Sequence, residues 1–445
     1  MYKLFSFLLI FAFLITTLTA CTISENEESS GWIVETVTIV DSSSSKNKEQ
    51  TQTSSQKDNS SKTVNNVSSK ENNSVNTNYE EDVFNVSYCT DEMLKKSLMY
   101  KGDTTRLASK IKAALADKNS TTKIAYLGDS ITEGAVVGVG NSHYGNQFAA
   151  AWRKNIGNNV TVNIKGYGAT TSHLGVHIVD DIILKDKPDI IFIEYVNDPK
   201  GMDITLNCMD SLLRKCLSLD NKPAVILLEM SYHGTTNAQT THYKSAKAYG
   251  VPMISWQNAL TLPLIEGDIK WSDVSPDEVH PNATGHGMLA EMMWYLTSLV
   301  MPTASASKAP DAFNTPAITD DIFKNCKVLN RTNYTPTSVG NFTESADFGP
   351  LKYGWATTTG GEITFKVTGR SIGFAYLASH TFANGKAEVY VDGNLISTYN
   401  GKQSGYSCIR TVELRLYKTA DEHTIRIKVA DGELNDFQIL GLFVS

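Results

Sequence analysis

The sequence predicts a two-domain protein: an α/β domain with a flavodoxin-like, doubly wound parallel sheet, followed by an antiparallel β-sandwich of jelly-roll-like type. Between residues 123 and 299, short apolar runs typical of buried strands alternate with amphipathic segments typical of helices. Beyond residue 347 the spacing of apolar residues changes to a period of two, which indicates strands with one buried face. A chain of 445 residues is also too long for one ordinary core.

The N-terminus is predicted to lie outside both domains. Lys3 precedes an apolar run over residues 4–18, which has the length of a signal-peptide core and is short for a membrane span. Residues 18–21, with the sequence LTAC, resemble the lipobox of bacterial lipoproteins, in which the cysteine is lipidated. We therefore expect residues 1–20 to be a lipoprotein signal peptide and Cys21 to anchor the protein to the bacterial cell membrane. A plain signal peptide and an uncleaved anchor remain alternatives, and all three place the chain outside the cytoplasm.

Residues 21–84 are predicted to be a disordered tether. They consist mostly of Ser, Asn, Thr, Lys and Glu, apart from a short apolar stretch over residues 32–40. Such a composition cannot bury enough apolar area to offset the entropy of ordering. A flexible segment of about 55 residues reaches on the order of 40 Å, which would hold a domain clear of a membrane surface. The same composition is also compatible with a tail that has no role.

The charge of the chain excludes a nucleic-acid partner. The formal net charge is −7 and the isoelectric point is near 5.8, so no basic stripe is available to neutralise phosphates. The expected partner of the N-terminal segment is instead a membrane, through the lipid anchor.

The remaining cysteines indicate no metal site, because none has the spacing of zinc ligands. Cys208 and Cys216 fall in one predicted helix about two turns apart, too far to bridge each other. Cys326 and Cys408 form a candidate disulfide in an oxidising compartment, although the odd count weakens a regular framework. Most of these cysteines are expected to be small buried residues.

The α/β domain is assigned to residues 85–301. Asp103 is expected to cap its first helix, which carries apolar residues on one face. The predicted strands and later helices then follow in alternation: strands 123–127, 160–164, 189–195, 224–230 and 251–255, and helices 147–155, 177–184, 203–219, 241–249 and 287–299. In such a sheet, ligands bind at the carboxyl ends of the strands.

Residues 302–320 are predicted to be a linker and residues 321–445 a β-sandwich. The linker is rich in Ala, Ser and Pro, and apolar residues then alternate with polar ones around positions 363–367, 387–391 and 425–429. Asp392-Gly393 is a strong signal for a hairpin turn.

A serine stands on a turn directly after the first strand. Ser130 follows Gly128 and Asp129 at the end of the apolar run over residues 124–127. A nucleophilic serine has to be exposed on such a sharp strand-to-helix turn and needs a neighbouring base. The alternative is an ordinary loop in which Ser130 caps a helix.

A base for this serine is available just before the last helix of the α/β domain. The spacing of Asp277 and His280 lets one loop present a carboxylate that holds the imidazole while the ring accepts a serine proton. A solvated turn is the alternative, and Asp273 is a second candidate for orienting the ring.

Two further segments can supply hydrogen-bond donors to an oxyanion. Gly168, after the second strand, can offer an unobstructed backbone N–H, and Asn197, after the third, a side-chain amide. Their ordinary roles would be a turn glycine and a loop cap.

Taken together and in this order, these four segments over residues 123–299 resemble the SGNH (GDSL) hydrolase family. The resemblance implies that Ser130 is the nucleophile, His280 the general base and acid, and Asp277 the orienting carboxylate. It also implies an oxyanion hole built from the Ser130 N–H, Gly168 and Asn197, and a reaction without a cofactor. Tyr195 stands where the family often has glycine, which is expected to narrow or reshape the cleft, and His286 is expected to be structural.

The sequence thus predicts a serine esterase, whose expected partner is an acylated polysaccharide or a small ester. Acetylated polysaccharide is the favoured substrate, because the protein is predicted to be tethered and to carry a sandwich domain, as some carbohydrate esterases do. Two alternatives remain, a cell-wall glycan O-acetyltransferase with the same triad and a non-catalytic glycan-binding surface protein. A lipase is less favoured, because no long apolar segment indicates a lid. Aromatic residues that could stack on sugars are Tyr353, Trp355, Phe382, Tyr399 and Tyr406, with Trp256 and Trp271 flanking the catalytic loop.

Overall fold

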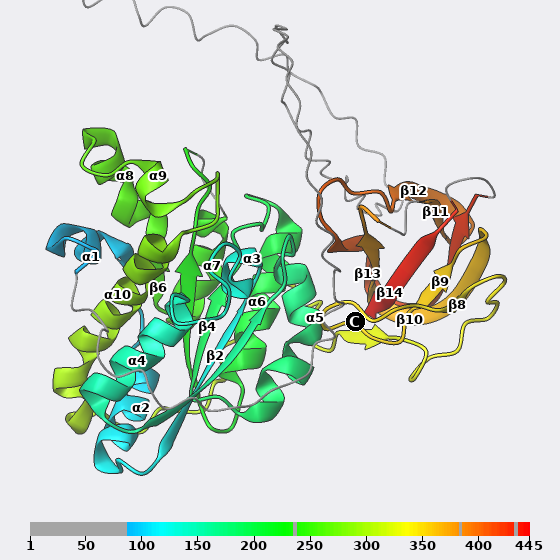
Figure 1. Ribbon diagram of the computed structural model, residues 1–445. Helices are drawn as coiled ribbons and strands as arrows, with labels where there is room; N and C mark the ends of the chain where they lie inside the picture. The colour runs from blue at the N-terminus through cyan, green and yellow to red at the C-terminus, as the bar shows by residue number, and fades with distance from the viewer. Residues whose placement is uncertain (1–86, 235–237, 382–384, 431–434) are drawn as a thin grey trace, which may run out of the picture.

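The computed structural model describes residues 87–234, 238–381, 385–430 and 435–445. They form an α/β domain and a β-domain that lie side by side (Figure 1). The predicted signal peptide, the lipidation site at Cys21, the tether over residues 21–84 and the candidate stacking residue Phe382 lie outside the described residues. Within the described ranges, no helix has both the length and the apolar character needed to cross a membrane.

Six strands form the sheet of the α/β domain. They are β1 (Leu98–Tyr100), β2 (Thr121–Gly128), β3 (Asn159–Gly166), β4 (Ile190–Glu194), β5 (Ala224–Glu229) and β6 (Met253–Ser255). The spatial order is β1-β6-β5-β4-β2-β3, in which β2 to β6 are parallel and β1 is antiparallel to β6. Counted from β2, the parallel strands have the 2-1-3-4-5 order of flavodoxin-like sheets, so the predicted fold class is confirmed. The sequence does not indicate the short edge strand β1.

Helices cover both faces of this sheet. They are α1 (Asp91–Ser97), α2 (Thr105–Ala116), α3 (Ser130–Glu133), α4 (Tyr144–Ile156), α5 (Ser172–Ile182), α6 (Asp203–Leu217), α7 (Gln239–Tyr249), α8 (Trp256–Glu266), α9 (Trp271–Val274) and α10 (Ala283–Val300), with 3-10 turns at Leu184–Asp186 and Met301–Ala306. The helices α2, α4 and α10 pack on one face, and α5, α6 and α7 pack on the other.

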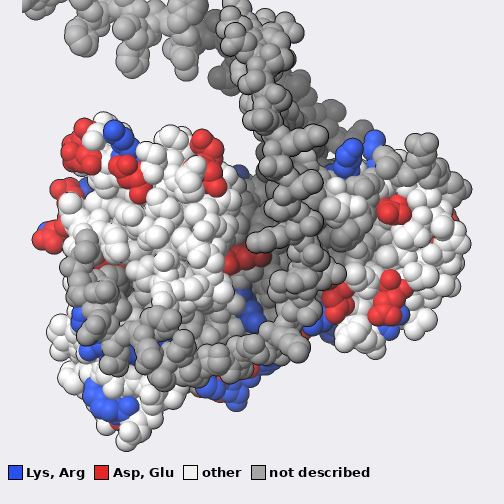
Figure 2. All heavy atoms as spheres, viewed as in Figure 1, with Lys and Arg blue, Asp and Glu red and all other residues white. Residues whose placement is uncertain are grey.

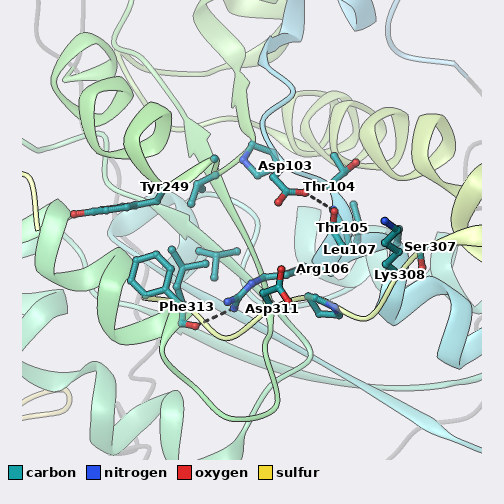
Figure 3. Close-up of a pocket in the computed structure, with 18 of the residues that line it drawn as sticks. Asp103, Thr104, Thr105, Arg106, Leu107, Tyr249, Ser307, Lys308, Asp311 and Phe313 are labelled. Atoms are coloured by element: carbon teal, nitrogen blue, oxygen red, sulfur yellow. Dashed lines mark hydrogen bonds between the residues drawn. The ribbon is translucent and has the colours of Figure 1, made fainter. Parts of the chain in front are cut away.

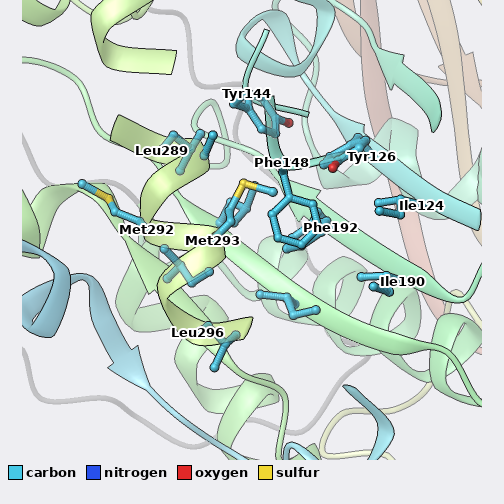
Figure 4. Close-up of a cluster of buried hydrophobic side chains, with 14 of the residues drawn as sticks. Ile124, Tyr126, Tyr144, Phe148, Ile190, Phe192, Leu289, Met292, Met293 and Leu296 are labelled. Carbon is cyan, nitrogen blue, oxygen red and sulfur yellow. The ribbon is translucent and has the colours of Figure 1, made fainter. Parts of the chain in front are cut away.

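The apolar strands divide their side chains between these two layers. Along β2, Tyr126 faces the layer of α4 and α10, whereas Leu127 faces the layer of α5 and α6. Figure 4 shows the first of these cores, in which Phe148 of α4 and Met293 of α10 lie beside Phe192 of β4. Burial on both faces is the reason that these strands are continuous apolar runs in the sequence.

Several helices differ from the sequence prediction, among them α5 and α8. Helix α5 begins at Ser172, five residues before the predicted start, and it contains Gly175. A Cβ at Gly175 would lie 2.2 Å from the Tyr195 hydroxyl, so the glycine is in the helix to make room for that ring. Helix α8 is not indicated by the sequence because it contains Pro263 and has no clear apolar stripe.

The connector between the domains lies against the α/β domain. Residues 307–317 contain no helix or strand, as expected of a linker, but they are held along its surface. Arg214 donates to the carbonyl of Thr315 at 2.5 Å, and Lys222 donates to that of Pro310 at 2.7 Å. Between the connector and the start of α2 lies a cavity of about 680 Å³, shown in Figure 3, which is bordered by Arg106 and Phe313. The cavity lies at the amino end of β5, the end of the sheet away from Ser130.

The β-domain is an eight-stranded antiparallel sheet. Its strands are β7 (Lys327–Leu329), β8 (Thr343–Glu344), β9 (Trp355–Thr357), β10 (Gly361–Ala378), β11 (Lys386–Val391), β12 (Asn394–Asn400), β13 (Cys408–Val429) and β14 (Phe437–Val444). The path runs β12-β11-β13-β10-β14-β9-β8, and β7 pairs with β14. The long strands β10 and β13 lose register near Gly369, which lets the sheet fold over its own core as in a β-sandwich.

The predicted period of two is confirmed in this domain. Ile363, Phe365 and Val367 of β10 point into one apolar core together with alternate residues of β11 and β13. The predicted hairpin is also confirmed, because Asp392 and Gly393 connect β11 and β12 with φ angles of 50° and 81°. A positive φ at both central residues is typical of a type I′ turn.

The two domains share a buried interface formed by α5. Leu174 and Ile178 of α5 pack against apolar residues of the β-domain, and the His177 ring stacks on Phe443 with centroids 4.2 Å apart. His173 lies 3.3 Å from the Glu413 carboxylate, and both side chains are buried. Figure 1 shows α5 lying beside the sheet of the β-domain. An apolar interface of this kind holds the two domains together as one unit.

The candidate disulfide between Cys326 and Cys408 is not present. Cys326 packs in the core beside α5 and donates to the carbonyl of Val176 at 3.0 Å, whereas Cys408 belongs to the separate core of the β-domain. Both are free thiols, as are the other cysteines that the structure describes, and all are buried. The prediction failed because sequence alone does not place two cysteines in the same core.

Candidate active site

Ser130 begins the short helix α3 directly after β2. Asp129 caps this helix, and its carboxylate accepts from the N–H of Ile131. A Cβ at Gly128 would lie 2.2 Å from the Thr132 hydroxyl, and one at Gly166 would lie 1.9 Å from the backbone nitrogen of Glu133. The two glycines therefore allow α3 to fold back onto the ends of β2 and β3, which presents Ser130 at the edge of the sheet.

The structure brings Ser130, His280 and Asp277 together, although Ser130 and His280 are 150 residues apart in the chain. The His280 Nε2 lies 2.9 Å from the Ser130 Oγ, and its Nδ1 lies 2.8 Å from the Asp277 Oδ2. A carboxylate only accepts hydrogen bonds, so it places the ring proton on Nδ1 and leaves Nε2 to accept from the serine hydroxyl.

Asp273, the second candidate for orienting the ring, has a different role. Its Oδ2 accepts from the N–H of Lys270 at 2.9 Å, which caps the start of α9. The prediction that favoured Asp277 agrees with this geometry, because the Asp277 Oδ1 also accepts from the N–H of His280 at 2.7 Å.

Hydrogen bonding keeps Asp277 ionised. Burial alone would raise the pKa of this carboxyl group, but hydrogen bonds from the N–H groups of His280 and Val279 and from the His280 ring lower it below its usual value. Asp277 therefore carries its charge throughout the neutral pH range.

Trp271 supports the loop that carries these two residues. Its indole N–H donates to the carbonyl of Asp277 at 2.6 Å, and its ring stacks on that of His233 with centroids 4.9 Å apart. The Ser275 hydroxyl lies 2.8 Å from the same carbonyl and 2.7 Å from that of His280. The sequence indicated only that Trp271 lies near the loop; Trp256, the other tryptophan named for this region, is buried in the core.

Gly168 lies beside Ser130, as predicted. A Cβ at Gly168 would be 3.8 Å from the Ser130 Cβ and 2.7 Å from the Glu133 Oε2. The Glu133 carboxyl group therefore lies next to Gly168. The pKa of Glu133 is raised by burial, an effect that the N–H of Gly168 and the charge of His280 partly offset. Glu133 was not predicted from the sequence, although it lies three residues after Ser130 and hence on the same helix face.

Asn197 is tied to the serine turn. Its Nδ2 and its backbone N–H donate to the Asp129 Oδ2 at 2.9 and 3.0 Å, and its Oδ1 accepts from the Tyr232 hydroxyl at 2.5 Å. These contacts fix which way the amide faces, and Nδ2 carries a second hydrogen besides the one given to Asp129. Tyr232 is a further residue that the sequence analysis missed.

The β-domain reaches this part of the site. The pKa of Tyr232 is raised to about 12, mainly by burial and then by the charges of Asp129, Glu194 and Tyr406. Tyr406 belongs to the β-domain and its side chain is 49% exposed. Of the other predicted stacking residues, Tyr353 is exposed, whereas Trp355 and Tyr399 are buried in the sandwich core because they face inward on their strands.

Tyr195 does not narrow the cleft, so that prediction is wrong. The side chain is 4% exposed and its ring packs against Gly175 of α5, which points it away from the site.

His286 is buried, and its Nδ1 accepts from the N–H of Tyr144 at 3.1 Å. Burial lowers the pKa of His286 to about 3, so the ring is neutral and its contacts fit the expected structural role.

A buried ion cluster holds the loop that follows Asn197. The Asp198 Oδ2 lies 2.9 Å from the His242 Nε2, and both Glu229 oxygens lie 3.1 Å from the His242 Nδ1. The Asp198 Oδ1 accepts from the N–H of Ser172, which begins α5. The cluster therefore joins β4, β5, α5 and α7 at the edge of the sheet beside the site.

Comparisons with known proteins agree with the fold and with the family resemblance of the α/β domain. The sequence profile of the GDSL-like Lipase/Acylhydrolase family matches residues 126–288. No curated protein matches the chain in sequence. Among solved structures, the chain is similar to a two-domain esterase (CEX) active on acetylated mannans, with a TM-score of 0.73 and 24% identity over 79% of this chain and 98% of that chain. A structure of a two-domain esterase of the same description, co-crystallised with mannopentaose, gives a TM-score of 0.72 and 24% identity over 79% and 97% of the two chains. The similarity in fold thus extends over both domains.

Proposed function

This chain contains a GDSL/SGNH hydrolase domain, and we propose that it is a serine esterase that removes acetyl groups from a polysaccharide. The observation that carries the proposal is the unbroken chain of contacts from Ser130 through His280 to Asp277, at 2.9 and 2.8 Å. A serine in contact with an oriented imidazole is the arrangement that nucleophilic acyl transfer requires.

The reaction proceeds through an acyl-enzyme. The Ser130 Oγ attacks the ester carbonyl carbon while the His280 Nε2 takes its proton. The oxyanion that forms is held by the N–H groups of Ser130 and Gly168 and by the Asn197 amide. His280 then gives the proton to the leaving sugar alcohol. Water, activated by His280, releases acetate and restores Ser130.

A neutral polysaccharide is the substrate class that we favour. The fold of both domains is similar to that of an esterase active on acetylated mannans. On the described residues of the face in Figure 2, acidic and basic side chains are scattered, with no basic cluster to attract a polyanion. Tyr406 is the exposed aromatic residue of the β-domain whose charge acts on Tyr232, and we propose that its ring stacks on a sugar of the substrate. We also propose a lipid-anchored, extracytoplasmic location, which the apolar run over residues 4–18 and Cys21 support.

Acetate release from a panel of polysaccharides tests this function. We expect wild-type protein to release acetate from acetylated mannan faster than from acetylated xylan, pectin or peptidoglycan. Transfer of acetyl groups to a glycan acceptor in place of acetate release would instead indicate the O-acetyltransferase. Absence of turnover on every ester would contradict the enzyme and leave a glycan-binding protein.

Tyr406→Ala is expected to raise the KM for acetylated mannan roughly fivefold, because an aromatic contact contributes about 1 kcal/mol. The KM for p-nitrophenyl acetate, which has no sugar, should not change. Tyr353→Ala is the matched control, since Tyr353 is a tyrosine of the same domain with a similar exposure of 44%. An equal change in both variants, or in both substrates, would contradict a sugar contact at Tyr406.

Asp277→Asn is expected to lower kcat for p-nitrophenyl acetate by about 10²–10³-fold. The rate falls because an amide does not fix the His280 tautomer. The fall in kcat should be smaller than the roughly 10⁴-fold loss found in enzymes in which the orienting carboxylate is buried, because the Asp277 side chain is 46% exposed. Steady-state kinetics with Asp273→Asn as the control checks this, since Asp273 only caps α9. A larger loss in Asp273→Asn than in Asp277→Asn would reverse the two roles.

A further inference from the structure

Two buried carboxyl groups lie under Ser130, and the reaction above uses neither. Asp129, just before the serine, and Glu194, at the end of β4, are 0% and 1% exposed. The N–H of Asp129 donates to the Glu194 Oε2 at 3.4 Å, and the two carboxyl groups are close enough that each shifts the pKa of the other. Two carboxylates in such contact away from water repel each other strongly, so they keep a proton between them.

The surroundings of this pair offer donors but no counter-charge. Glu194 accepts from the Thr132 hydroxyl and from the N–H of Val196, both at 2.9 Å. Asp129 accepts from the N–H of Ile131 and from both nitrogens of Asn197. The other titratable groups facing the pair are neutral phenols at neutral pH, namely Tyr144, Tyr195 and Tyr232. With these partners one negative charge is stabilised, and a second is not.

We propose that Asp129 and Glu194 share one proton and act together as positioning residues that hold Asn197 in the oxyanion hole. The proposal rests on the proposed esterase function. The Asp129 Oδ2 receives two hydrogen bonds from Asn197, and its Oδ1 accepts from the N–H of Ile131. This arrangement fixes Asp129, and Asp129 with Tyr232 fixes the amide, so that the second hydrogen of Nδ2 is directed to the oxyanion.

The pair makes the site sensitive to high pH. Burial raises the pKa of both carboxyl groups, and the charge of Glu194 raises that of Asp129 further. The shared proton is therefore kept at neutral pH and lost only as the pH rises. Once it is lost, repulsion between the two carboxylates moves Asp129 away from the position that holds Asn197.

Glu194→Gln and Glu194→Leu separate this role from simple packing. Glutamine keeps Oε1 as the acceptor for the N–H of Val196 and puts an NH2 group in place of Oε2. That NH2 group can donate to Asp129 and to the Thr132 hydroxyl without a shared proton, so kcat for p-nitrophenyl acetate at pH 7 should stay within about threefold of wild type. Leucine removes these contacts, and kcat should fall about 10–100-fold with KM little changed, somewhat less than the loss of an oxyanion donor itself. The fall of kcat/KM at high pH should move upward or disappear in Glu194→Gln.

Glu413→Gln is the control, because Glu413 is a buried carboxyl group at the domain interface, away from Ser130. It should leave the high-pH fall unchanged. Infrared spectra at neutral pH give a readout that needs no activity: wild type should show a protonated-carboxyl band that Glu194→Gln lacks. Identical high-pH profiles in wild type and Glu194→Gln, no band difference, or wild-type kcat in folded Glu194→Leu would overturn the proposal. An inactive wild type that shows the band difference would contradict the esterase function but not the shared proton.

Discussion

Ser130→Ala is expected to abolish ester hydrolysis, with a loss of kcat on the order of 10⁴–10⁶-fold for p-nitrophenyl acetate. The residual rate should be close to that of the oxyanion hole alone, because His280 then has no hydroxyl to deprotonate. Circular dichroism and the melting temperature should match those of wild type, since alanine fills the first position of α3 without a clash.

Ser272→Ala is the matched control for this experiment. Ser272 is exposed and lies on α9 next to the catalytic loop, so its removal should leave the rate unchanged. A Ser130→Ala protein that keeps more than a few per cent of the wild-type rate would show that another group is the nucleophile.

His242→Gln is expected to destabilise the α/β domain by about 3–5 kcal/mol. His242 lies between Asp198 and Glu229, and all three side chains are at most 3% exposed. Removing the cation leaves two buried carboxylates without a counter-charge, which is the costly way to break a buried ion cluster. Differential scanning calorimetry should show a melting temperature lower by roughly 10 °C. His233→Gln, at an exposed pair with Glu278, should change it by no more than a few degrees.

The effect of His242→Gln should depend on pH with a defined sign. Burial alone would lower the pKa of His242, but Glu229 and Asp198 outweigh it and raise the pKa from 6.5 to about 10. A raised pKa means that the stabilisation is complete below pH 6.5 and is lost as the pH rises through about 10. The difference in melting temperature between wild type and variant should therefore shrink from pH 6 to pH 10. A difference that stays constant or grows would show that His242 is not charged in the folded protein.

The strands and the serine turn could be predicted because their signals are local. A parallel strand buried on both faces has to be apolar throughout, as residues 190–193 are, and a turn that brings α3 onto the sheet needs Gly128. The edge strand β1 and the helix α8 were missed because their residues carry no clear period, and neighbouring elements hold them in place.

The supporting groups of the site could not be predicted, since each depends on a partner far away in the chain. Glu133 is a surface-like glutamate in the sequence, and only the approach of Gly168 makes it part of the site. Glu194 ends an apolar strand without an evident reason until Asp129 lies beside it.

The fold class, the family resemblance and the order of the candidate catalytic segments could be inferred without coordinates, because apolar periodicity and short motifs are properties of neighbouring residues. Which groups meet follows from the three-dimensional packing alone. It placed His280 on Ser130 with Asp277 behind it, turned Tyr195 away from the cleft, and kept Cys326 and Cys408 in different cores. A hydrogen bond or a buried charge pair depends on distances of a few ångströms. The packing of α3, α5 and the strand ends sets these distances, whereas the spacing of residues along the chain does not encode them.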